Sequence, residues 1–187
     1  MKLPLAGGCQ CGAVRYEIAA EPSTVYACHC ADCQRQTGSA FALSMVVPRD
    51  ALRVTAGEPR IWLRPGTHTA SGTPAQAMFC GTCGARLYHF PSRAPARAIV
   101  KPGTLDDTSW LHAVGHIWTK RAQPWIVLPG DALNYEGQSP DFVALEAAWQ
   151  AHRRGARARS VAAISGIGAG LAAEDPMGIP EIGQGDR

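Results

Sequence analysis

Apolar and polar residues alternate in short runs along the first part of the chain. Residues 14–18 (Val-Arg-Tyr-Glu-Ile) have the period of two that is typical of a half-buried β-strand. Similar runs follow at residues 41–47, 52–55, 60–63, 76–79, 86–90, 98–100, 116–118 and 125–128. Glycine and proline residues separate the runs, as they do at turns. The pattern predicts eight or nine short strands in an antiparallel, mainly β domain.

Helical spacing replaces this alternation in two places. Residues 32–37 could form a single helical turn. Further on, Ser139-Pro140-Asp141 resembles a helix start, with a capping residue, a proline and an acid. Apolar residues then recur three and four positions apart, at Phe142, Leu145 and Trp149. We expect an amphipathic helix over residues 139–155 that ends at Gly155 and packs against the sheet.

The composition indicates one globular domain and a tail. Of 187 residues, 46% are hydrophobic and 18% charged, which is typical of a chain with a packed core. We expect a zinc-binding β domain at residues 1–138, the helix at 139–155 and a flexible tail at 156–187. Arginines 153, 154, 157 and 159 form a basic patch, for which a solvated helix end is favoured over a nucleic-acid contact.

The seven cysteines fall into three short motifs: Cys9-x-Cys11, Cys28-x-Cys30-x2-Cys33 and Cys80-x2-Cys83. The chain starts without the apolar run of a secretory signal and has no stretch that could span a bilayer, so we expect a cytoplasmic protein. In a reducing compartment such clusters indicate metal ligands rather than disulfides. Zn²⁺ prefers four ligands in a tetrahedron, and short cysteine loops supply two sulfurs each.

The unequal sizes of the motifs predict two zinc ions per chain with different roles. Two pairs from distant segments, Cys9 with Cys11 and Cys80 with Cys83, would close a structural site. Cys28, Cys30 and Cys33 would leave a fourth position open, as at a catalytic zinc. Spacing alone also permits exchange of pairs between the sites. Less favoured alternatives are an iron–sulfur cluster, a redox dithiol at Cys80 and Cys83, and cysteines that are merely buried.

Two bound zinc ions also change the charge balance. The formal net charge is +3, but seven thiolates and two Zn²⁺ bring the total to about zero. Nucleic-acid binding through bulk charge is therefore disfavoured.

Residues beside the central motif are candidates for substrate contact. His29 lies between two cysteines, and we expect its side chain to point away from the metal. His116 is expected to be a core or pocket histidine. Arg35 is a candidate contact for a substrate carboxylate, with an ordinary surface arginine as the equal alternative. Nearby polar residues that could donate to a substrate are Gln34, Thr37 and Ser39.

With these motifs assembled, the chain resembles the glutathione-dependent formaldehyde-activating enzyme family, which includes centromere protein V. The resemblance runs in order from about residue 5 to 135, through residues 8–16, 28–41, 79–87, 103–107, 116–118 and 124–125. It implies a compact, β-rich β-tent fold with the zinc partition given above. Together with the strand pattern and the helix expected at residues 139–155, this predicts a mainly β, antiparallel β-tent with a short C-terminal helix. It also implies carbon–sulfur lyase chemistry, in which formaldehyde and glutathione condense to S-(hydroxymethyl)glutathione.

The family's metal motifs build the fold and do not fix the substrate. The expected function is therefore addition of a thiol, glutathione or a similar one, to formaldehyde or a related small aldehyde, or the reverse. The alternatives are a non-catalytic zinc module that binds a partner and a lyase that acts on another thiol adduct. The fourth position of the central site separates them, because an open position favours an enzyme and a protein ligand favours a scaffold.

Overall fold

The computed structural model describes residues 1–165 of the chain. The chain divides into two compact units, Met1–Arg153 and Arg154–Arg187, and only the final part of helix α2 is described in the second. The two helices are α1 (Ala31–Thr37) and α2 (Val143–Ser165). The strands are β1 (Leu5–Gly8), β2 (Arg15–Ile18), β3 (Thr24–Cys28), β4 (Ala42–Pro48), β5 (Leu52–Ala56), β6 (Arg60–Arg64), β7 (Ala75–Phe79), β8 (Arg86–Pro91), β9 (Arg97–Val100), β10 (Gly115–Ile117) and β11 (Leu133–Tyr135).

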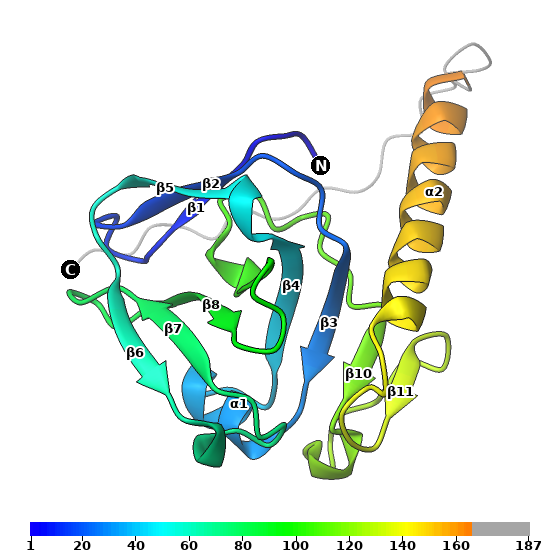
Figure 1. Cartoon of the computed structure of the whole chain (residues 1–187). Helices are drawn as coiled ribbons and strands as arrows, with labels where there is room; N and C mark the ends of the chain where they lie inside the picture. The colour runs from blue at the N-terminus through cyan, green and yellow to red at the C-terminus, as the bar shows by residue number, and fades with distance from the viewer. Residues whose placement is uncertain (166–187) are drawn as a thin grey trace, which may run out of the picture. The chain divides into compact units, whose positions relative to one another are not determined.

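The strands form two sheets (Figure 1). The larger has the order β11-β10-β3-β4-β9-β8-β7-β6, and the smaller has the order β1-β2-β5. All pairings are antiparallel except those of β10, which runs parallel to both β3 and β11. The predicted mainly β fold with a C-terminal helix is confirmed in the described residues. The predicted helical turn at residues 32–37 is α1.

Eight of the nine predicted runs contain a strand, and the run at 125–128 is wrong. It lies between Pro124 and Pro129, and two of its side chains, Trp125 and Val127, are 70% and 90% exposed. Residues 125–128 pair with no strand of the described sheets, so their apolar side chains do not form a buried face. Three strands were missed: β1, β3 and β11. All five residues of β3 are buried, so its sequence shows no alternation of exposed polar and buried apolar positions.

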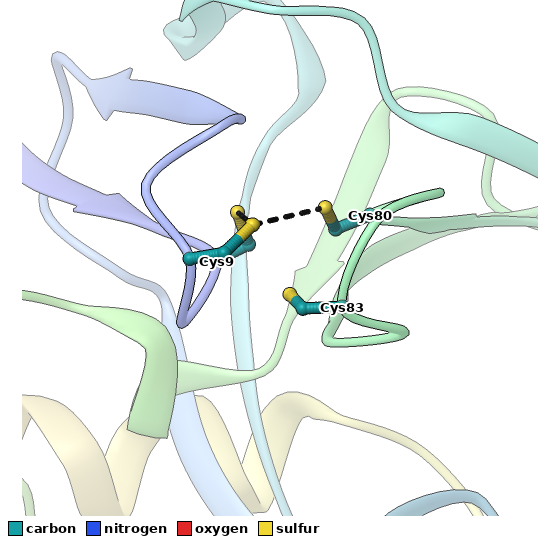
Figure 2. Close-up of side chains that lie close together, drawn as sticks. Cys9, Cys80 and Cys83 are labelled. Carbon is teal, nitrogen blue, oxygen red and sulfur yellow. Dashed lines mark hydrogen bonds between the residues drawn. The ribbon is translucent and has the colours of Figure 1, made fainter.

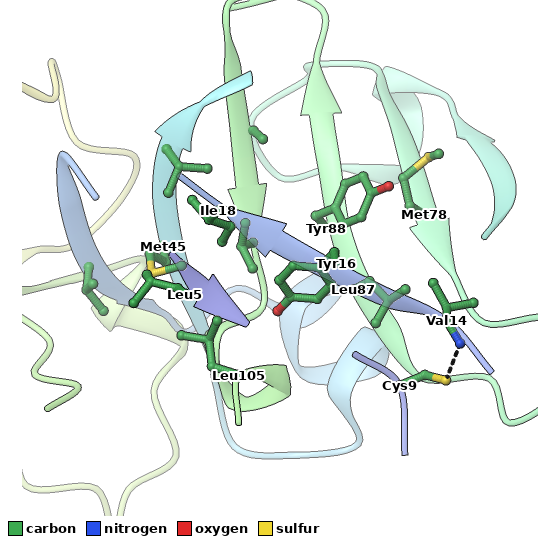
Figure 3. Close-up of a cluster of buried hydrophobic side chains, with 14 of the residues drawn as sticks. Leu5, Cys9, Val14, Tyr16, Ile18, Met45, Met78, Leu87, Tyr88 and Leu105 are labelled. Carbon is green, nitrogen blue, oxygen red and sulfur yellow. Dashed lines mark hydrogen bonds between the residues drawn. The ribbon is translucent and has the colours of Figure 1, made fainter. Parts of the chain in front are cut away.

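The central strands β3, β4 and β9 separate two hydrophobic clusters. Successive side chains of a strand point to opposite faces. Val25, Met45 and Val100 therefore join the larger cluster, which also contains Tyr16 and Cys9 (Figure 3). The neighbouring residues Tyr26, Val46 and Ile99 join the second cluster, together with Cys28 and Cys30. The cysteine motifs consequently belong to different layers of the core.

Helix α2 differs from the predicted helix at both ends. It begins at Val143, whose N–H donates to the carboxylate of Asp141 at 2.9 Å, so Asp141 rather than Ser139 caps the first turn. It continues past Gly155 to Ser165, because one glycine costs a helix only about 1 kcal/mol and good helix formers surround it. Residues 156–165 of the expected tail are thus helical, and residues 166–187 lie outside the described residues. Within the described part, no helix combines the length and apolar character of a membrane span.

The first turns of α2 pack against β10 and β3. Leu145 and Trp149 are both fully buried. Gly115 in β10 permits the close approach, since a Cβ there would lie 2.3 Å from Cδ2 of Leu145. The hydroxyl of Thr24 in β3 donates to the carbonyl of Leu145 at 3.0 Å. Leu145 belongs to the second hydrophobic cluster and Trp149 to the larger one, so the start of α2 contributes to both.

Leu145→Ala should lower the free energy of unfolding by about 2–5 kcal/mol, because a fully buried leucine leaves a cavity when truncated. The matched control is Val143→Ala, since Val143 lies on the same helix and is 70% exposed. Urea denaturation of both variants measures the difference. Equal stability of the two variants would contradict the docking of α2 against β10.

Candidate metal centres

Four cysteine sulfurs from two distant loops converge in the structure (Figure 2). Cys9 and Cys11 lie between β1 and β2, and Cys80 and Cys83 lie between β7 and β8. The four Sγ atoms are all within 4.8 Å of one another. The Sγ–Sγ distance is 3.5 Å from Cys9 to Cys11 and 3.7 Å from Cys11 to Cys80. We call this set the four-sulfur group.

The two loops of the four-sulfur group close in the same way. The N–H of Cys9 donates to the carbonyl of Val14 at 3.0 Å, and that of Cys80 donates to Ala85 at 2.9 Å. Each loop turns at a glycine with positive φ, +77° at Gly12 and +74° at Gly84, which a side chain would disfavour. The two cysteine loops therefore share the same closing hydrogen bond and the same glycine turn.

Backbone N–H groups point at the sulfurs of this group. The N–H of Val14 lies 3.2 Å from Sγ of Cys9, and the N–H of Thr82 lies 3.4 Å from Sγ of Cys80. Hydrogen bonds from the backbone of Cys83 and Thr82 lower the pKa of Cys80. Thiolates are the form of cysteine that binds metal, so these backbone donors favour the liganding state of Cys80.

The donor set of the four-sulfur group fits zinc. A tetrahedron with Zn–S bonds near 2.3 Å has edges of about 3.8 Å, close to the two sulfur separations given above. Cys9 and Cys80 are 6% and 1% exposed, so the group lies against the larger hydrophobic cluster. A closed set of four thiolates with hydrogen-bonded sulfurs is typical of a structural site.

The other three cysteines form a second set, the three-sulfur group. Cys28 ends β3, Cys30 occupies the N-cap of α1, and Cys33 lies in the first turn of that helix. Their Sγ atoms are within 4.8 Å of one another, and Cys33 N–H donates to Sγ of Cys30 at 3.4 Å. Hydrogen bonds from Cys28 and Cys33 lower the pKa of Cys30. Among the described residues, no other cysteine, histidine or carboxylate completes this group.

A cavity of about 90 Å³ adjoins the three-sulfur group. All three cysteines line it. Its walls also include residues of strands β3, β4, β6, β8 and β10 and of the loop after β6. Its other polar lining residues include Tyr26, Ser44, Arg64, His89 and Lys101. The group therefore faces a space that a small molecule can enter.

The histidine inside the central motif points elsewhere. Nε2 of His29 lies 2.9 Å from Nδ1 of His116, and the ring is fully buried beside Phe41. His29 is not part of the three-sulfur group, and neither histidine lines the cavity. The expected orientation of His29, away from the metal position, agrees with this geometry.

The residues predicted to contact substrate from α1 and the turn after it lie outside the cavity. The side chain of Arg35 is 81% exposed and lies 3.9 Å from the Asp32 carboxylate. The amide of Gln34 donates to the carbonyls of His29 and Arg121, which fixes the start of the helix. Thr37 donates to the carbonyl of Cys33, and Ser39 lines a separate, wider cavity. The structure thus does not bring Arg35 or these neighbours to the space beside the sulfurs.

Sequence reasoning missed the polar residues that do line the cavity. Tyr26 and Ser44 are directly paired across β3 and β4. Tyr26 precedes Cys28 by two positions in a strand, so assignment of β3 would have placed both on one face. Lys101 follows three apolar residues of β9 and is 7% exposed. Arg64 and His89 carry no sequence signal, because only the tertiary fold brings β6 and β8 to this place.

Comparisons with known proteins agree with the motifs. Residues 4–121 match the sequence pattern of the family described as "Glutathione-dependent formaldehyde-activating enzyme". Three relatives carry the name "Putative glutathione-dependent formaldehyde-activating enzyme". The Penicillium rubens protein is 33% identical over 88 residues, covering 44% of each chain. The Emericella nidulans protein is 32% identical over 82 residues, covering 43% of this chain and 39% of the relative.

The third relative, from Halomonas elongata, is 28% identical over 93 residues, covering 49% of this chain and 59% of its own. The matches thus span about half the length of these relatives. A crystal structure of a Rhodobacter sphaeroides protein aligns with a TM-score of 0.45 and 24% identity, over 70% of this chain and 99% of the other. Since the family pattern extends through both cysteine groups, the chain belongs to the glutathione-dependent formaldehyde-activating enzyme family.

Proposed function

We propose that the protein is a zinc-dependent, carbon–sulfur lyase-type enzyme that adds a thiol to a small aldehyde, or catalyses the reverse. The thiol is glutathione or a similar molecule, and the aldehyde is formaldehyde or a related one, as the names of the relatives suggest. The four-sulfur group would hold a structural zinc and the three-sulfur group a catalytic one. The protein would act in the cytoplasm, where cysteines stay reduced.

The observation that carries this proposal is the cavity beside the three-sulfur group. A structural site has a closed ligand set, whereas a catalytic zinc keeps one position for substrate. Within the described residues three sulfurs converge without a fourth protein ligand, and all three border the same space. This arrangement favours an enzyme over a scaffold that uses metal only to fold.

The reaction adds the thiol S–H across the carbonyl double bond. A C–S bond forms, the C=O π bond breaks, and the carbonyl oxygen gains the proton. Zinc held by Cys28, Cys30 and Cys33 would supply Lewis-acid polarisation of the aldehyde or stabilisation of the thiolate. The chain's remaining task is to orient the two reactants and to place a donor near the oxygen.

Tyr26 and Ser44 are suited to donate to that oxygen. Both hydroxyl-bearing residues line the cavity, and they face each other across adjacent strands. Burial raises the pKa of Tyr26, so its phenol stays neutral and keeps its proton to donate. A donor fixed on a strand loses little freedom when the transition state forms.

Tyr26→Phe should lower kcat/KM by about tenfold or more, because one hydrogen bond to the developing oxyanion is lost. Tyr135→Phe is the matched control, since Tyr135 packs in the same cluster but does not line the cavity. Steady-state kinetics of the two variants with formaldehyde and glutathione measure the effect. Unchanged kinetics in Tyr26→Phe would exclude Tyr26 as a donor.

The proposed reaction is tested with purified protein of known zinc content. Incubation with glutathione and formaldehyde should form the adduct faster than the uncatalysed mixture, as followed by NMR. No acceleration with two zinc ions bound would refute the named reaction. A stoichiometry near one zinc per chain would refute the two-site arrangement itself.

A further inference from the structure

Positive side chains surround the cavity beside the three-sulfur group. Arg64 and Lys101 line this cavity. Lys101 also lines a wider neighbouring cavity of about 490 Å³, together with Arg86. Lys101 directly follows strand β9 and is only 7% exposed. Three strongly basic groups thus lie around two cavities that share a wall.

These basic groups lack carboxylate partners. None of the ion pairs formed by the described residues includes Arg64, Arg86 or Lys101. Nε of Arg64 and both Nε and Nη2 of Arg86 are buried without a hydrogen-bond partner. Arg86 has an aromatic neighbour, the ring of Trp62 at 5.8 Å. Buried donors of this kind are costly unless another group accepts from them.

Burial and neighbouring positive charges lower the pKa values of Lys101 and His89. Burial lowers the pKa of Lys101, and Arg86 and Arg64 lower it further, while Cys33 and Cys28 oppose the shift. Burial, together with the charges of Lys101, Arg64 and Arg86, holds the pKa of His89 well below its usual range. The basic groups therefore repel one another across a small volume.

The cysteines compensate only part of this charge. Three thiolates around a divalent ion carry a net charge of −1, and Asp32 in the cavity wall adds one negative charge. The Asp32 carboxylate already accepts from the N–H of Ala70 at 2.7 Å. Lys101, Arg64 and Arg86 contribute three positive charges when protonated. A positive charge is left over, and one bound anion would balance it.

We infer that this cavity binds a small carboxylate-bearing molecule, an oxo acid whose carboxylate contacts Lys101 and Arg64 while its carbonyl faces the three-sulfur group. The cavity is small beside the roughly 300–1,000 Å³ of sites that enclose drug-sized ligands, so it admits a molecule of few heavy atoms. Arginine and lysine are the side chains that bind carboxylates best. The carbonyl half of this inference rests on the proposed function, and the carboxylate half does not.

The test uses two unreactive probes of the same shape, glycolate and its neutral amide, glycolamide. Calorimetric titration of the zinc-loaded full-length protein should show glycolate binding about ten- to hundredfold more tightly, as expected for charge-assisted hydrogen bonds. Lys101→Met should reduce glycolate binding to the level of glycolamide, and Arg64→Gln should weaken it. The matched control is Arg35→Gln, which removes an exposed charge outside the cavity and should leave binding unchanged.

Several results would overturn the inference. Equal binding of the two probes, or no binding of glycolate, would show that the basic groups do not select an anion. Loss of one zinc from Lys101→Met, with glycolate binding retained in Arg64→Gln, would show that the charges serve only to balance the thiolates. If Lys101→Met fails to fold, Arg64→Gln alone decides between these outcomes.

An activity assay with two aldehydes distinguishes failure of the anion site from failure of the proposed reaction. Glyoxylate should replace formaldehyde in the adduct assay with glutathione, and Lys101→Met should affect glyoxylate more than formaldehyde. No turnover of either aldehyde, with glycolate still preferred over glycolamide, would refute the proposed reaction and leave the anion site standing. Turnover of formaldehyde without any preference for glycolate over glycolamide would refute the anion site and leave the proposed reaction standing.

Discussion

Cys80→Ser should abolish cooperative folding or lower the melting temperature more than any other single change considered. Cys80 is 1% exposed, belongs to the larger hydrophobic cluster, and accepts a backbone hydrogen bond from Thr82. The four-sulfur group joins the β1–β2 loop to the β7–β8 loop, and thus the smaller sheet to the larger one. A structural zinc contributes about 10–16 kcal/mol in small zinc domains, as much as the whole net stability of a typical protein.

Thermal unfolding followed by circular dichroism, with zinc content measured in parallel, tests this expectation. Thr82→Ser is the matched control, because Thr82 lies in the same exposed loop and binds Cys80 only through its backbone. A folded Cys80→Ser variant with unchanged melting temperature would show that the four-sulfur group does not stabilise the fold.

Cys30→Ser should remove nearly all activity, by about a thousandfold, while the fold persists. A metal that polarises the reacting group contributes several kcal/mol to the transition state, and loss of one of three ligands should empty the site. Serine is the appropriate replacement because Cys30 occupies the N-cap of α1, and serine is a favoured N-cap residue. The helix therefore keeps a cap while the metal loses a ligand.

The measurement combines steady-state kinetics, circular dichroism and zinc analysis on Cys30→Ser. Zinc content should fall from two ions to one, and the melting temperature should change far less than in Cys80→Ser. If both variants unfold alike, or both keep activity, the division into structural and catalytic sites is wrong.

The family pattern and the geometry support different parts of this picture. Family membership follows from the sequence match across residues 4–121. The proposed roles of the two cysteine groups follow from one contrast in the structure, a closed set of four sulfurs against a set of three that borders a cavity. The anion site rests on the basic side chains around that cavity, of which Arg64 and Lys101 lie outside the motifs that carry the family resemblance.

The sequence by itself determined the mainly β fold and the grouping of cysteines into short motifs. Strands such as β2 are half-buried, so apolar and polar residues alternate in their sequence and the strand can be predicted from it. The short cysteine motifs are also local, because two cysteines separated by one or two residues lie close together whatever the rest of the fold. The C-terminal helix was predicted for the same reason, through the spacing of Leu145 and Trp149.

Only the tertiary structure decided where the cavity lies and which residues line it. Strand β3 is buried on both faces, so it carries no alternation and was missed, and with it the common face of Tyr26 and Cys28. Arg64 in β6 and Lys101, which follows β9, line the same cavity as the three-sulfur group. Arg35, close in sequence, points to solvent because α1 presents it on its outer side. Proximity along the chain fixes backbone loops, whereas the lining of a cavity depends on the packing of strands that are far apart in sequence.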